Sequence, residues 1–426
     1  MQVRNVLYTG VPIHTVTSVT GKLTEDGRRL DSGTMLYTLR LTSVTDKYGT
    51  KASASGVLPL FAEDSKKRQW GSVISVPAEI VKDDRDGGWI AFKRSGPITE
   101  VTPPDTLFLY RGNIQNILLE RIERLPSESG SLFQALFLGL RDDLSEQEVA
   151  LFRKSGAVHL LALSGMHLGI ITGVISLILL PLIGKRGAFT FAVFVVICYV
   201  FIVGLKPSLL RAAVMFFLIG FGLLRGRRIS GPVILITAFI ILALVYPGSL
   251  HTLSFKLSFL ALAGILAAGK KVSNKLVRFI PAPIVLPLAA SFGAQLAVTP
   301  LIAVEFGTVY PVGIGASLLL APLVTLFMVL GMVTLLLPGG ILLHVAALFM
   351  GLINRVIFSI ASAGASVPHI NLLTGEERST AAAAAVVVCS LFLFSGLFPG
   401  AVPLFVRRLF GDHRIPLFSR KVKSGL

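Results

Sequence analysis

The chain has 426 residues, of which 53% are hydrophobic and only 15% are charged, and its mean hydropathy is +0.76. So large an apolar excess excludes a protein whose whole surface is solvated by water, and it predicts membrane-spanning segments. The two cysteines, Cys198 and Cys389, lie inside apolar runs, so neither a disulfide framework nor a zinc signature is expected and no cofactor is predicted.

The formal net charge of +17 is unevenly distributed. Residues 1–130 carry 17 basic and 15 acidic side chains, whereas residues 131–426 carry 23 basic and 8 acidic ones. Lys and Arg retained in cytoplasmic loops would account for this surplus in a membrane protein. A polyanionic substrate would also account for it, and both interpretations stay open.

Residues 1–120 are predicted to form a small all-β domain. Alternating runs such as HTVTSVTGKL, MLYTLRLTSV and WGSVISVPAEIV are separated by turn signals at EDG, DSG and DRDGG. Five or six strands of this length suit an OB-like barrel. Its aromatic residues could stack on bases in a single-strand groove, but packing in the core and turns is the favoured interpretation. These residues are Tyr37, Tyr48, Trp70, Trp89 and Phe92.

Residues 121–157 are predicted to contain two short amphipathic helices, SLFQALFLGL and EQEVALFRKSG. Ser145 and Glu148 form a capping-box pattern at the start of the second helix. Helices this short and charged are expected to lie at the membrane interface and not to cross the bilayer.

Residues 158–400 are predicted to form a polytopic α-helical membrane domain of about nine segments, because apolar runs of 17 to 25 residues follow one another there. The predicted segments are 158–181, 188–205, 207–224, 231–247, 253–269, 281–305, 311–337, 340–366 and 381–399.

Basic clusters predict the orientation. They follow the first, third and fifth predicted spans, at Lys185–Arg186, Arg225–Arg228 and Lys270–Arg278, and they recur in the tail, residues 401–426, after the ninth. Nine spans place all of them on the cytoplasmic side of the membrane and the β domain outside. Because no signal peptide precedes that domain, we expect either that the natural chain starts upstream or that a span has been lost.

The first predicted span begins HLLALSGMHLGII, which is rich in small residues. Gly165, Gly169 and Gly173 recur every four residues and predict a smooth ridge against which another helix packs closely.

The same stretch carries three polar side chains, His159, Ser164 and His167. Ser164 and His167 lie three apart on one helix face, so a serine nucleophile with a histidine base is conceivable. No acid partner is evident nearby, which disfavours hydrolysis. Hydrogen bonding to neighbouring helices and the lining of a hydrophilic path are the alternatives.

Charged residues inside spans are costly and are therefore functional suspects. Here they are Arg211, Lys256 and Glu305, with Lys206 at a boundary. The predicted topology places all four near outer ends of their spans, which predicts a basic, anion-attracting mouth. Snorkelling of the cations to lipid headgroups is the alternative.

Proline and glycine interrupt the sixth and seventh predicted spans, so broken or re-entrant helices are expected to line a path there. The residues are Pro300, Pro311, Pro322, Gly307, Gly313 and Gly315.

Four stretches in fixed order, HLLALSGMHLG, KPSLLRAAVM, FKLSFLALAGI and AQLAVTPLIAVEFGTVYPVGIGASLLLAPLV, resemble the competence domain of ComEC-type DNA-uptake proteins. The resemblance implies an inner-membrane channel for single-stranded DNA in natural transformation, and not an enzyme. It implies channel or packing roles for His159, Ser164, Gly165, His167, Ser208, Arg211, Ser258 and Gln295.

The resemblance also implies partners: single-stranded DNA, the lipid bilayer, a DNA receptor, a cytoplasmic translocation ATPase and a second copy of the chain in a homo-oligomer. Several features depart from the family. Lys256 stands where the family usually has glutamine, and the family's N-terminal spans and metallo-β-lactamase-like domain have no counterpart in this sequence. Neither an H-x-H-x-D-H metal motif nor a Walker A pattern is found. A transporter for a small or lipid-linked anion, and a hydrolase using Ser164, are the competing hypotheses.

Overall fold

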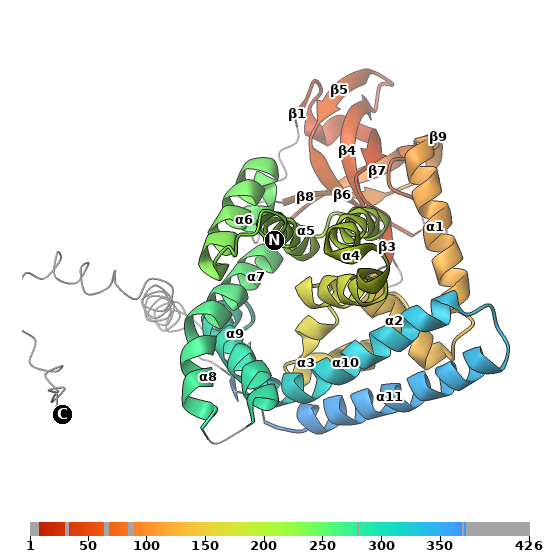
Figure 1. Cartoon of the computed structure of the whole chain (residues 1–426). Helices are drawn as coiled ribbons and strands as arrows, with labels where there is room; N and C mark the ends of the chain where they lie inside the picture. The colour runs from red at the N-terminus through yellow and green to blue at the C-terminus, as the bar shows by residue number, and fades with distance from the viewer. Residues whose placement is uncertain are drawn as a thin grey trace, which may run out of the picture. The chain divides into compact units, whose positions relative to one another are not determined.

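The structure is a computed structural model that describes residues 8–29, 34–63, 68–83, 89–278, 281–368 and 370–371. The chain divides into two compact units. Figure 1 labels their helices and strands. The first unit comprises residues 1–256 and 310–369, and the second comprises residues 257–309 and 370–426.

The first unit begins with a β-barrel. Its strands are β1 (Tyr8–Thr9), β2 (Val16–Leu23), β3 (Arg28–Arg29), β4 (Met35–Asp46), β5 (Lys51–Ser55), β6 (Val57–Ala62), β7 (Val73–Asp83), β8 (Trp89–Arg94) and β9 (Thr99–Thr102).

Five of these strands close into a ring, because β2 pairs with β4, β4 with β6, β6 with β8, β8 with β7 and β7 with β2. Only the β6–β8 pairing in this ring is parallel. Numbered along the chain, the ring runs 1-2-3-5-4-1, which is a closed Greek-key barrel of the OB type. The predicted OB-like barrel is therefore confirmed.

Alternation along the strands fills the barrel core with apolar side chains such as Val19, Leu39 and Ile74, none of which is exposed. Tyr37 and Phe92 are equally buried, so for these two aromatic residues the core interpretation is correct. Tyr48, in contrast, is 78% exposed at the β4–β5 turn, where the ammonium of Lys47 lies 5.1 Å from its ring centroid.

The helices of the first unit are α1 (Thr106–Ile122), α2 (Ser127–Phe137), α3 (Glu146–Lys154), α4 (Gly165–Val203), α5 (Pro207–Leu224), α6 (Gly231–Val245), the start of α7 (Leu253–Gly264), α10 (Gly313–Leu336) and α11 (Ile341–Ala365). The second unit holds the rest of α7, a π-helix (Ile265–Gly269), α8 (Lys270–Leu276), α9 (Ala282–Phe306), β10 (Thr308–Val309) and β11 (Ile370–Asn371).

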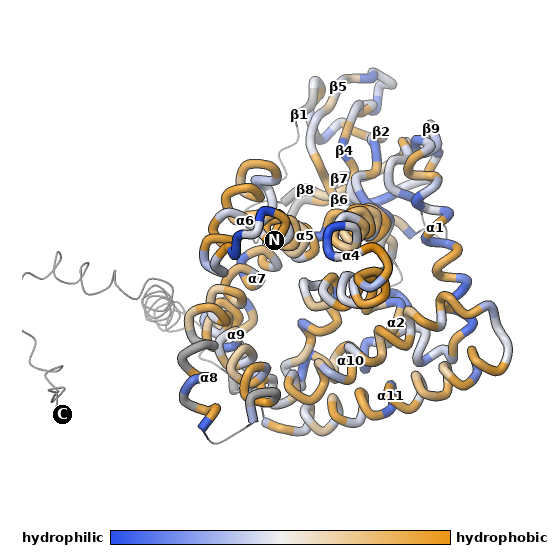
Figure 2. Tube along the Cα trace, in the orientation of Figure 1, coloured by the Kyte–Doolittle hydropathy of each residue, from blue (hydrophilic) through white to orange (hydrophobic). Residues whose placement is uncertain are grey.

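Six described helices are long and apolar enough to cross a membrane: α4, α5, residues 253–274, α9, α10 and α11. Figure 2 shows hydrophobic residues along most of α10 and α11. The set of nine predicted spans is not confirmed. Helix α6 has only 15 residues, and the predicted ninth span, residues 381–399, lies outside the described residues together with the tail.

Helix α4 contains the first two predicted spans, separated by a break at Gly184. The backbone of Gly184 has φ 68° and ψ 176°, which a residue without a Cβ adopts easily. The break leaves two halves of about 19 residues, each long enough to cross the hydrocarbon core. The predicted boundary is thus found, although seven residues of the first predicted span precede the helix.

The predicted breaks at Pro300 and Pro322 are wrong, since α9 and α10 continue through them. Neighbouring groups can accommodate a proline inside a membrane helix, so its presence alone does not break the helix. The chain leaves the helical conformation at Gly307, which ends α9 with φ 71°, and β10 follows.

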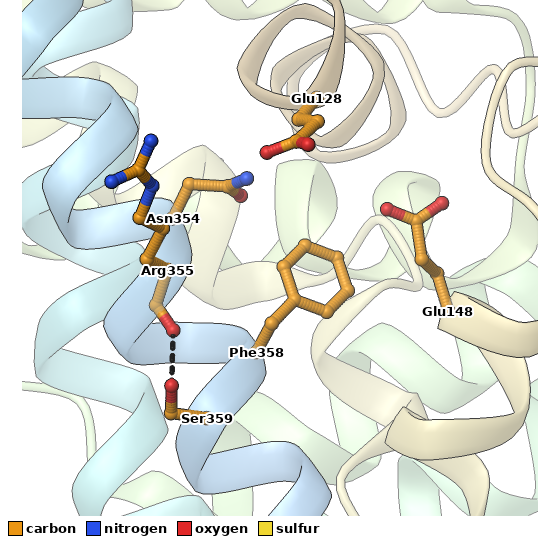
Figure 3. A pocket seen from close by; sticks show the side chains of 6 residues that line it. All are labelled: Glu128, Glu148, Asn354, Arg355, Phe358 and Ser359. Atoms are coloured by element: carbon orange, nitrogen blue, oxygen red, sulfur yellow. Dashed lines mark hydrogen bonds between the residues drawn. The ribbon is translucent and has the colours of Figure 1, made fainter.

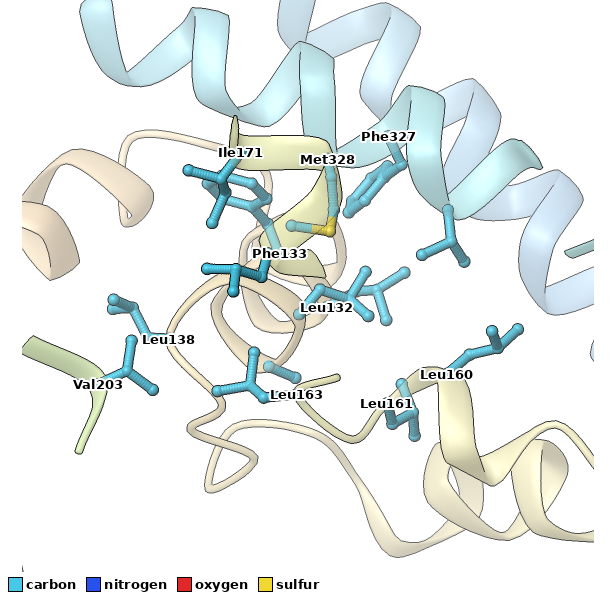
Figure 4. Packing of buried hydrophobic residues seen from close by; sticks show 14 of the residues in the cluster. Leu132, Phe133, Leu138, Leu160, Leu161, Leu163, Ile171, Val203, Phe327 and Met328 are labelled. Carbon is cyan, nitrogen blue, oxygen red and sulfur yellow. The ribbon is translucent and has the colours of Figure 1, made fainter. Parts of the chain in front are cut away.

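Helix α2 differs from the predicted interfacial helix, because seven of its eleven residues are buried. Phe133 lies in the helical core, edge-on to Phe327 (Figure 4). Its ring is also stacked on that of Phe137. A Cβ at Gly331 of α10 would lie only 2.2 Å from the Phe133 ring, so this glycine makes room for it. In α3, the predicted capping box between Ser145 and Glu148 is confirmed.

Helix α1 was expected to be part of the β domain, but it is a helix that joins the barrel to the membrane helices. Its Arg111 side chain is 2% exposed and donates to both carboxylate oxygens of Asp26, at 2.9 and 2.7 Å. Its Nε donates to the carbonyl of Phe201 in α4, at 2.8 Å, and its guanidinium lies over Trp70. Asp26 also accepts from the Trp70 backbone N–H, at 2.9 Å. One buried cation thus connects three parts of the fold.

We expect Arg111→Ala to lower the midpoint of thermal unfolding in detergent by at least about 5 °C, because removing one partner of a buried ion pair costs about 3 to 5 kcal/mol. The fluorescence of Trp70, which contacts Arg111, would report the transition. The exposed pair of Lys22 and Asp105, 3.0 Å apart, provides the control. Lys22→Ala should cost at most about 1 kcal/mol. Equal effects of the two substitutions would contradict the role given to Arg111.

Candidate functional site

The first predicted motif folds as an entry into α4 and not as part of a span. Residues Val158–Leu160 form a 3-10 turn in which His159 is exposed, and Ser164 caps the helix. The Ser164 hydroxyl accepts from the Met166 N–H at 3.3 Å, and His167 Nδ1 accepts from the Ser164 N–H at 3.3 Å. Ser164 and His167 are therefore reciprocal caps, a variant of the capping box in which histidine replaces the acid.

This geometry decides how Ser164 and His167 are interpreted. The hydroxyl of Ser164 lies 3.1 Å from His167 Nδ1, which is the distance that a nucleophile and its base would need. However, His167 is fully buried, and its Nε2 has no hydrogen-bond partner among the described residues, so no described carboxylate orients the ring. Capping accounts for the pair without any catalysis.

The second predicted motif forms the start of α5, directly beside the first. Ser208 donates to the carbonyl of Leu163, at 2.5 Å, and Gly165 faces Ala212. Lys206 donates to the carbonyl of Gly139, at 3.0 Å, so its ammonium serves the end of α2. The snorkelling predicted as an alternative is therefore not needed for Lys206.

Gly139 lies beside Lys206 and Leu163, and its role was not predicted from the sequence. Its φ is +68°, and a Cβ there would lie 2.3 Å from Lys206 Nζ and 2.4 Å from a Leu163 methyl carbon. Only glycine lets these groups approach, and the signal in the sequence was a glycine directly after an apolar helix.

Arg211 lies one turn beyond Ser208 on α5 and is 8% exposed. Lys256 on α7, in contrast, is exposed. The structure therefore gathers Ser164, Gly165, His167, Lys206, Ser208 and Arg211 at the starts of α4 and α5. We call these six residues the α4–α5 cluster.

The remaining predicted residues belong to the second unit. Ser258 on α7 and Gln295 on α9 are partly buried, and Glu305, near the end of α9, is exposed. Helices α7 and α9 approach each other closely at Gly264 and Gly293, where an added Cβ would lie 2.2 or 2.7 Å from the opposite carbonyl oxygen. This glycine contact was not predicted.

The predicted glycine ridge of α4 is mostly uncovered. A Cβ at Gly165 would lie 3.5 Å from Ala212, but one at Gly169 or Gly173 would meet nothing within 4 Å among the described residues. Close helix packing is thus wrong for the last two of these glycines as far as the described chain extends, and all three are exposed.

Comparison with known proteins bears on the same residues. Residues 136–401, which include the α4–α5 cluster, match a family described as "Competence protein". The chain is 28% identical to ComE operon protein 3 of Bacillus subtilis (strain 168) over 236 residues, or 55% of this chain and 29% of that protein. It is 27% identical to an uncharacterized protein of Aquifex aeolicus (strain VF5) over 227 residues, or 53% and 52%. No solved structure matches.

The chain thus aligns with less than one third of the first relative and about half of the second. The family match nevertheless covers most of the membrane helices and all of the α4–α5 cluster. On that match, this multi-pass membrane protein belongs to the competence protein family, in its ComEC type.

Proposed function

We propose that this chain is a channel that passes a single strand of DNA across the bacterial inner membrane during natural transformation. The observation that carries the proposal is the family match over residues 136–401, the part of the chain that holds the membrane helices and the α4–α5 cluster. ComE operon protein 3, which is 28% identical to this chain over 236 residues, is named as a product of the ComE operon.

The barrel supports the same proposal, since OB folds bind nucleic acids on the face of their second and third strands. In this chain those strands are β4 and β6. Arg40 is exposed on β4, and Phe61 is half-buried on β6, so this face offers a cation for phosphate and a ring for base stacking. The barrel would meet DNA outside the cell, with the C-terminal tail in the cytoplasm.

Charge would guide the strand from the barrel into the membrane. Arg211 on α5 and Lys256 on α7 are cations on apolar helices. A charge there raises the free energy of membrane insertion, so charged residues at such positions usually have a function. A DNA receptor would deliver the strand, and a cytoplasmic translocation ATPase would supply the energy.

The proposal as a whole is tested by deleting the gene in a transformable host and measuring uptake of labelled DNA. We expect transformation to be lost and to return when the full chain is expressed from a plasmid. Normal transformation in the deletion strain would overturn the proposed function.

Arg211→Ala should reduce DNA import about tenfold, because a contact between a charged donor and phosphate contributes about 1.5 to 3 kcal/mol. Arg211→Lys should retain most of the import, and Lys256→Ala should act in the same direction as Arg211→Ala. Arg225→Ala is the matched control, since Arg225 lies at the opposite end of α5.

The same Arg211 variants allow a measurement on purified protein. For single-stranded DNA, each lost phosphate contact should lower the slope of log binding constant against log salt concentration by about 0.7. Wild-type import and an unchanged slope in the double variant of Arg211 and Lys256 would show that these cations only anchor the helices. Competition by inorganic phosphate, and not by DNA, would favour an anion transporter.

Substitutions of Ser164 distinguish a channel from a hydrolase. Ser164→Ala should destabilise the start of α4 by about 1 kcal/mol, since the cap is lost, and reduce import accordingly. Ser164→Asn keeps an acceptor for the N-cap but has no nucleophile, so it should restore both stability and import. Failure of the Asn variant to import DNA, in protein as stable as the wild type, would favour the nucleophile interpretation.

A further inference from the structure

A hollow of about 470 Å³ lies between α2, α3 and α11 and shares no residue with the α4–α5 cluster (Figure 3). It is lined by Glu128, Glu148, Asn354, Arg355, Phe358 and Ser359. Its size is in the range of small-molecule sites.

The amide oxygen of Asn354 indicates that the hollow holds a ligand. Its side chain is 2% exposed, and its Oδ1 has no hydrogen-bond partner among the described residues. A buried carbonyl oxygen without a donor is destabilising and is rare in native proteins. Figure 3 shows the amide of Asn354 and the carboxylates of Glu128 and Glu148 around the same space. A bound donor would satisfy the amide oxygen there.

The two carboxylates determine the charge of such a ligand. Glu148 is held in place because its Oε2 accepts from the Ser145 N–H and hydroxyl, at 2.8 and 2.9 Å. Glu128 lies in the first turn of α2. Arg355 also lines the hollow, but Figure 3 shows its guanidinium directed away from Glu148. The described acceptors therefore favour a cation that donates hydrogen bonds.

The ring of Phe358 restricts the kind of cation that suits the hollow. Its ring is half-buried and is held edge-on by Phe152, with ring centroids 5.7 Å apart. An aromatic wall beside carboxylates suits a cation with an apolar stem. A bare metal ion would leave most of the hollow empty, and the described residues contain no group of three His, Cys, Asp or Glu side chains that could hold one.

We propose that this hollow binds an aliphatic amine, with its ammonium group donating to Glu128, Glu148 and the Asn354 carbonyl, and its methylene stem against Phe358. The same chemistry is offered by a free polyamine and by a lysine side chain. The proposal is independent of DNA transport.

The test is isothermal titration of the full chain in detergent with spermidine and, separately, with lysine amide. We expect saturable binding of spermidine at one site. Weaker binding of lysine amide would assign the site to a free polyamine, and equal binding would assign it to a terminal ammonium group of the lysine type. Saturable binding of neither compound would overturn the proposal.

Variants locate the binding. Glu148→Gln keeps the capping box, because glutamine also serves at that position, and should weaken spermidine binding at least about tenfold through loss of charge. Asn354→Leu, which removes the amide oxygen, should do the same. The matched control is Glu146→Gln in the same helical turn, outside the hollow, which should change affinity by less than about twofold. Equal weakening by Glu146→Gln, or equal heat from magnesium at the same ionic strength, would mean unspecific attraction and overturn the proposal.

Discussion

Helices that end in an apolar environment leave their last carbonyl oxygens without partners, and donors from elsewhere have to reach them. In this protein α1 supplies several of these donors. Arg111 donates to Phe201 and Gln115 to Ile202 at the end of α4, while Arg121 donates to the end of α10. Cationic donors suit these positions because the C-terminal end of a helix carries partial negative charge. Helix α1 therefore holds the ends of two membrane helices and, through Arg111, the barrel.

The same constraint shapes the α4–α5 cluster. Helix α2 is buried, so its last carbonyls also need donors: Tyr199 reaches Phe137 at 2.7 Å, and Lys206 reaches Gly139. Lys206 is the residue before α5, and Arg111 binds α4 only a few residues upstream of it. The hydrogen bonds of Arg111 therefore connect the barrel and α1 to the end of α4, five residues before Lys206.

The features that depend on neighbouring residues in the sequence were predicted correctly. The barrel followed from alternation and turns, the break at Gly184 from the charged pair after it, and the cap of α3 from Ser145 and Glu148. Burial of α2 could not be predicted, because it depends on Gly331 making room for Phe133 from a helix far along the chain. The breaks expected at Pro300 and Pro322 were wrong for a similar reason, because the groups that allow a helix to continue through a proline can belong to other helices.

Most polar residues of the α4–α5 cluster are occupied in holding backbone groups. Ser164 and His167 cap one helix, Ser208 fixes the turn before it, and Lys206 closes another helix. Substituting these residues would therefore disturb the fold, whatever contact they make with DNA. On the proposed function, the contacts with the strand are therefore expected from Arg211 and Lys256, the cations within α5 and α7. A cation that binds phosphate carries no information about the base sequence, which is the property that sequence-independent transport would require.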